Sequence, residues 1–197
     1  MSSITIENIN SKADLKRKTA KPLLWIGIVS IIMFFSGWTS AVIVSKGGAP
    51  DWLNINLPSA FTYSTFIIVL SSLFFHFGLI AIKKDQKSLL KVLVLLTLFA
   101  GIGFVISQFL GWKSLYNEGI VATGSESTNA SSYLYLITAF HVLHLLAGII
   151  SLIVVSVKSF LGKYSSTNYL GVELSLIYWH FLGALWIYLF FFLKYIA

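Results

Sequence analysis

The sequence contains no cysteine, which excludes disulfide bonds, thiolate metal sites and a cysteine nucleophile. Charge is also scarce: 11% of the 197 residues are charged, and only 7 of them are acidic. Hydrophobic residues make up 57% of the chain. An ordinary soluble domain has about 25% charged residues, so this composition indicates an integral membrane protein.

Several functional motifs are missing as well. The chain has no glycine-rich phosphate loop, no HExxH metal motif, no nucleophile triad and no internal repeat. The formal charge of +7 would suggest a nucleic-acid ligand in a soluble protein. Here the basic residues border the apolar runs, so we expect them to set membrane topology and expect no nucleic-acid partner.

The apolar residues form five continuous runs, each with roughly the 20 residues that a transmembrane helix needs. They do not alternate with polar residues, as the strands of a membrane barrel would. We therefore predict an all-α, polytopic bundle of five transmembrane helices, with a cytoplasmic tail at 1–21 and a membrane domain at 22–197. Pro22 suits a helix's first turn. The expected helices cover about 22–44, 59–82, 88–110, 132–157 and 169–196.

The basic residues predict the orientation, because cytoplasmic loops are enriched in lysine and arginine. With the N-terminus inside and the C-terminus outside, eleven basic residues lie on the inner side and three on the outer side. We also expect the first run to act as an uncleaved signal anchor. The inner residues are Lys12, Lys16, Arg17, Lys18, Lys21, Lys83, Lys84, Lys87, Lys91, Lys158 and Lys163, and the outer ones Lys46, Lys113 and Lys194.

Glu173 is the only carboxylate inside a predicted span. Either hydrogen bonds satisfy it, or it exchanges protons. His180 lies on the same helical face but seven residues away, about 10 Å along the axis at 1.5 Å per residue. Direct contact is therefore not expected. We predict His76 as its partner by depth, with His141 and His144 as alternatives.

The other polar residues in the spans have two interpretations each. His141 and His144 share a helical face; they either ligate a haem or hydrogen-bond at a helix junction that Gly148 allows to pack closely. His76 either pairs with Glu173 or reaches the inner interface. Gln108 is expected to make an amide hydrogen bond between helices.

Three spans carry motifs of polar and aromatic residues. The last span carries Glu173, then Tyr178-Trp179-His180-Phe181 and Trp186. The fourth carries Tyr135, Thr138, His141, His144 and Gly148, and the first carries the segment Ser30–Gly37. In residue type and spacing these motifs resemble the cytochrome c oxidase subunit III family of the haem-copper oxidases. The chain departs from the family at Ile31, where an intramembrane glutamate is usual, and at Gly183, where an aspartate is common.

The resemblance implies an accessory, non-redox subunit of the short five-helix bacterial type. It implies contact with the catalytic subunit I, assembly with subunit II and other respiratory subunits, and bound phospholipid. Haems and copper are expected in the partner subunits and not in this chain. The subunit would support proton uptake and enzyme longevity in the bacterial cytoplasmic membrane.

No residue is expected to be catalytic, to bind a cofactor or to bind metal. The intramembrane polar or lipid-associated residues are expected to be Glu173, His180, Tyr178, Trp179, His141, His144, His76 and Gln108.

Other functions stay open at this point. The chain could be the haem b membrane anchor of a respiratory dehydrogenase, or an accessory subunit of a quinol oxidase or nitric oxide reductase. A dihaem anchor needs two pairs of facing histidines, whereas three of the four histidines here are expected near mid-depth on two helices. A transporter component is disfavoured, because the spans lack the interrupted helices of a midplane site.

Overall fold

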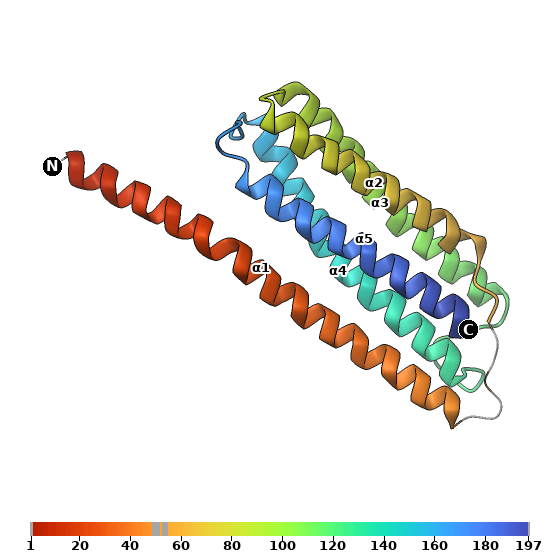
Figure 1. Cartoon of the computed structure of the whole chain (residues 1–197). Helices are drawn as coiled ribbons and strands as arrows, with labels where there is room; N and C mark the ends of the chain where they lie inside the picture. Colours follow the sequence, from red (N-terminus) through yellow and green to blue (C-terminus); the bar gives the residue numbers. More distant parts are fainter. Residues whose placement is uncertain (1, 49–51, 53–54, 197) are drawn as a thin grey trace.

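The computed structural model describes residues 2–48, 52 and 55–196, which form five helices (Figure 1). Each helix is long and apolar enough to span a membrane, α1 from Lys18 onward. No strand occurs within these described residues, so the all-α prediction is confirmed. The helices are α1 (Ser2–Gly47), α2 (Ser59–Lys83), α3 (Lys87–Asn117), α4 (Asn129–Phe160) and α5 (Leu170–Ile196).

The helix ends differ from the hydropathy-based boundaries. Pro22 does not occupy a first turn: α1 starts at Ser2 and runs through the proline. The helices α3 and α4 also extend beyond their apolar runs, and Thr128 caps α4 in a reciprocal pair of hydrogen bonds with Ser131. Hydropathy marks the part of a helix that hydrocarbon covers, and these helices continue past it.

Helices α2 to α5 form a four-helix core, and α1 stands beside it (Figure 1). Helices consecutive in the chain run in opposite directions (Figure 1), and a short turn joins α2 to α3 with Asp85 at a positive φ of 57°. Within the described residues, α1 packs against α4 and α5 alone. Its contact is made by a small apolar cluster in which Phe35 and Val42 meet Ile137, Leu185 and Leu189.

The centre of the core is built around Trp179, which is fully buried. Two glycines make room for its indole. A Cβ added to Gly101 of α3 would lie 2.7 Å from the Trp179 ring, and one added to Gly148 of α4 would lie 3.2 Å from it. Helices α3, α4 and α5 therefore meet closely at the depth of Trp179.

Candidate functional site

Two tryptophans of α5 connect that helix to α2. The Trp179 Nε1 donates to Ser71 Oγ at 2.9 Å, and the Trp186 Nε1 donates to Thr65 Oγ1 at 2.9 Å. Each buried indole thus has the partner it needs in an apolar interior. The sequence reasoning missed these pairs. The sequence does contain a signal for them. Trp179 and Trp186 are seven residues apart on one helix, and their hydroxyl partners Ser71 and Thr65 are six residues apart on an antiparallel helix.

His180, next to Trp179 in the chain, lies outside this buried layer. Its Nδ1 shares a hydrogen bond with Ser72 Oγ, and its ring lies 5.7 Å from that of His76, centroid to centroid. The two histidines line a groove of about 430 Å³ between α2 and α5, the α2–α5 groove. Its lining residues are Ile68, Val69, Ser72, Leu73, His76, His180, Gly183, Ala184 and Ile187.

His141 and His144 occupy a different place, between α4 and its neighbours. The buried His141 ring lies 5.1 Å from Trp186, 5.9 Å from Phe104 and 6.4 Å from Phe35. Neither of its nitrogens has a hydrogen-bond partner within the described residues.

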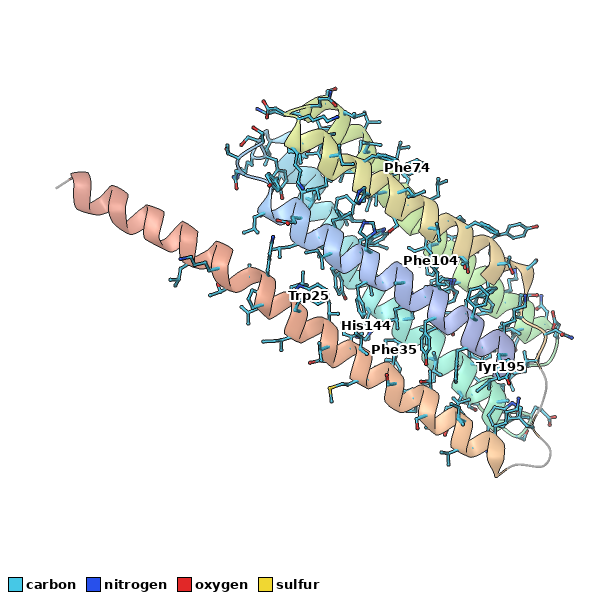
Figure 2. The ribbon with its side chains drawn as sticks, viewed as in Figure 1. Trp25, Phe35, Phe74, Phe104, His144 and Tyr195 are labelled. Carbon is cyan, nitrogen blue, oxygen red and sulfur yellow. The ribbon has the colours of Figure 1, made fainter. Side chains whose placement is uncertain are left out.

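The His144 Nδ1 hydrogen-bonds to the Phe140 carbonyl of its own helix at 2.7 Å. Its ring lies beside Phe35 of α1, at 5.6 Å between centroids (Figure 2). Tyr178 OH donates to the His144 carbonyl at 3.1 Å, which links α5 to α4. The described residues contain no group of three or more histidine, cysteine, aspartate or glutamate side chains placed to hold a metal ion.

Glu173 pairs with Lys21, whose Nζ lies 2.7 Å from Glu173 Oε1. The expectation that His76, His141 or His144 would be its partner is therefore wrong. Because α1 continues as a helix through Pro22, it carries Lys21 alongside the first turn of α5. The two side chains are 44% and 26% exposed, and they line a hollow of about 230 Å³ with Thr167, Tyr169 and Leu170.

A second hollow, of about 380 Å³, lies between α1, α4 and α5 at the same end of the bundle. Lys158 and Tyr164 are among the polar residues that line it, and Leu24, Val154 and Leu174 are among the apolar ones. Burial raises the pKa of the Tyr164 phenol above its ordinary value. A cation, a neutral hydroxyl and apolar walls together suit an amphiphilic ligand.

Gln108 is buried, and its Nε2 donates to Ser64 Oγ of α2 at 2.8 Å. This is the expected hydrogen bond between helices from the side-chain amide of Gln108. Ile31, one of the positions that depart from the family motifs, packs beside the cluster that holds α1. Gly183 lies in the α2–α5 groove.

Comparison with known proteins agrees with the sequence motifs. The family model described as cytochrome c oxidase subunit III matches residues 54–197. The cytochrome c oxidase subunit 3 of Thermostichus vulcanus is 30% identical over 174 residues, which cover 85% of this chain and 82% of that protein. The probable cytochrome c oxidase subunit 3 of Nocardia farcinica is 28% identical with the same coverage. The Synechocystis protein is 29% identical and covers 83% of this chain and 70% of its own length. The chain therefore belongs to the cytochrome c oxidase subunit III family.

Proposed function

We propose that this chain is the accessory, non-redox subunit III of a proton-pumping haem-copper terminal oxidase. It packs against the catalytic subunit I in the bacterial cytoplasmic membrane, with its N-terminus in the cytoplasm. Haems and copper belong to the partner subunits. Its part is to hold phospholipid, sustain proton uptake and prolong the active life of the enzyme.

The packing around His141 is the observation that carries the non-redox role. Three aromatic rings from α1, α3 and α5 surround its imidazole. A haem ligand needs an open ring nitrogen facing the macrocycle, and here that space is filled by Phe35, Phe104 and Trp186. This arrangement favours structural histidines over the haem b anchor considered from the sequence.

The hollows at the Lys21 end of the bundle support the phospholipid. Lys158 supplies positive charge beside the Lys21–Glu173 ion pair, and Tyr164 supplies a hydroxyl. Apolar residues of α1, α4 and α5 line the same hollow. A phospholipid can place its phosphate against Lys158 and its acyl chains against Leu24, Val154 and Leu174.

Deletion of the chain tests the proposal in the assembled enzyme. We expect the oxidase without it to start at nearly the normal rate of oxygen consumption and to lose activity earlier during sustained turnover. The intact complex, purified through this chain in mild detergent, should contain a haem-copper subunit. A haem Soret band stoichiometric with this chain after its partners are removed would contradict the non-redox role.

A further inference from the structure

The outward surfaces of the bundle differ in polarity. From Val92 to Leu110 on α3, and from Ala139 to Val157 on α4, every exposed residue is apolar. Such surfaces suit lipid acyl chains. The α2–α5 groove is different, because Ser72, His76 and His180 line it. The groove thus carries hydrogen-bonding groups that the exposed surfaces of α3 and α4 lack over these ranges.

His76 is the least satisfied of these groups. It is exposed, and among the described residues its ring contacts Phe77 and His180 without any hydrogen bond. His180 uses Nδ1 on Ser72, and its Nε2 makes no hydrogen bond with the part of the chain that the structure describes. His76 lies seven residues before the end of α2 at Lys83, or about 10 Å into the span at 1.5 Å per residue. A polar group left bare in hydrocarbon costs several kcal/mol.

We propose that the α2–α5 groove is the docking surface for a transmembrane helix of a partner oxidase subunit. That helix places a carboxylic acid or hydroxyl side chain against His76 and His180. The inference rests on the proposed function, in which this chain packs against other oxidase subunits, and it names the surface that does so.

The groove's chemistry and shape fit a helix better than a lipid. Acyl chains offer no hydrogen-bonding group at this depth, whereas a helix can present one at any depth. The groove is also lined by the small residues Ser72, Gly183 and Ala184, which let two helix backbones approach closely. A Cβ added to Gly183 would lie 3.7 Å from Ile68, an ordinary van der Waals contact, so nothing clashes with a methyl group at that point.

Because the chain has no cysteine, a single introduced cysteine gives a unique attachment point. Val69→Cys and Ala184→Cys lie in the groove, and Ile102→Cys on exposed α3 is the matched control. Each variant is labelled with benzophenone maleimide in native membranes and irradiated. We expect polypeptide adducts from the two groove positions and lipid adducts alone from Ile102→Cys. Lipid adducts alone at Val69→Cys and Ala184→Cys would overturn the proposal.

Retention in the purified complex provides a second measurement. Ala184→Trp fills the groove, and His76→Phe keeps the ring size but removes its hydrogen bonds. An interhelical hydrogen bond is worth about 1–2 kcal/mol in membranes, so we expect His76→Phe to weaken retention roughly tenfold. Ile102→Trp should be retained like the wild type. Undiminished retention of both groove variants would contradict the docking surface.

The outcomes separate this inference from the proposed function. If the wild-type chain co-purifies with a haem-copper subunit but the groove yields lipid adducts alone, the docking surface fails and the function stands. If the groove yields polypeptide adducts but no haem-copper subunit co-purifies, the assigned function fails, and with it the assignment of the docked helix to an oxidase subunit.

Discussion

Glu173 and Lys21 form an ion pair that ties the start of α5 to α1. Both side chains are partly exposed, and exposed pairs typically contribute about 0–1 kcal/mol. The pair therefore contributes little to overall stability. Its role is to position α1 against the start of α5, beside the two hollows at the Lys21 end of the bundle.

Substitution of Glu173 tests this positional role. We expect Glu173→Gln to leave haem spectra and initial oxygen consumption nearly unchanged. Because the variant loosens α1 at the hollows, it should weaken retention of the subunit or shorten activity during sustained turnover. Oxygen consumption over many turnovers, with subunit content after detergent purification, measures both effects. Lys21→Met should reproduce them, and the double variant should be no worse than either single one. Immediate loss of initial activity in a fully assembled Glu173→Gln enzyme would show that the residue takes part in catalysis.

The residue-scale predictions from sequence succeeded where helical geometry alone decides. Glu173 and His180 lie on one helix too far apart to touch, and each has a different partner. The partner of Glu173 was not predictable from hydropathy. It depends on the helical continuation of α1 through Pro22, where the residues are polar and no apolar periodicity marks the helix.

At the scale of the helices, packing depends on how Trp179 fits against two glycines. A Cβ on Gly101 would approach the Trp179 ring to 2.7 Å, whereas a Cβ on Gly103 would meet nothing within 4 Å. The indole is rigid, fully buried and hydrogen-bonded to Ser71. It therefore has little freedom to move away from an added methyl group.

The two glycines give a matched pair of substitutions. We expect Gly101→Ala to destabilise the folded chain by about 1–3 kcal/mol, the usual cost of overpacking. Gly103→Ala should stabilise it by up to about 1 kcal/mol, because alanine is the better helix former. Denaturation of both variants in mixed detergent micelles, followed by Trp fluorescence, measures the difference. Equal stabilities would mean that the Trp179 ring can move away from a methyl group at residue 101.

The five spans were predictable because each apolar run must cross the same hydrocarbon thickness. Which helices touch was harder to predict, because nearly every face of a membrane helix is apolar. The Trp179–Ser71 and Trp186–Thr65 pairs define the antiparallel register of α5 on α2. Hydropathy treats serine and threonine as weak interruptions, so it passes over the hydroxyls that set this register.

At the scale of the whole molecule, the distribution of basic residues predicts an inward N-terminus. We expect Ser125→Cys, between α3 and α4, to react with a membrane-impermeant maleimide in intact cells. Lys163→Cys, between α4 and α5, should react in inverted vesicles alone. Both positions are exposed, so poor access would not mask the result. The opposite labelling pattern would reverse the topology.

The restricted contacts of α1 have a consequence for how the protein is made. Helix α1 leaves the ribosome first, yet among the described residues its packing partners are α4 and α5, the last two helices to be synthesised. Translation proceeds at roughly 5–20 residues per second. The nascent α1 is therefore without its packing partners α4 and α5 for on the order of 10 s. Its continuous apolar span suits it to the bilayer during that interval, and it can pack on α4 and α5 only after α2 and α3 have also been synthesised.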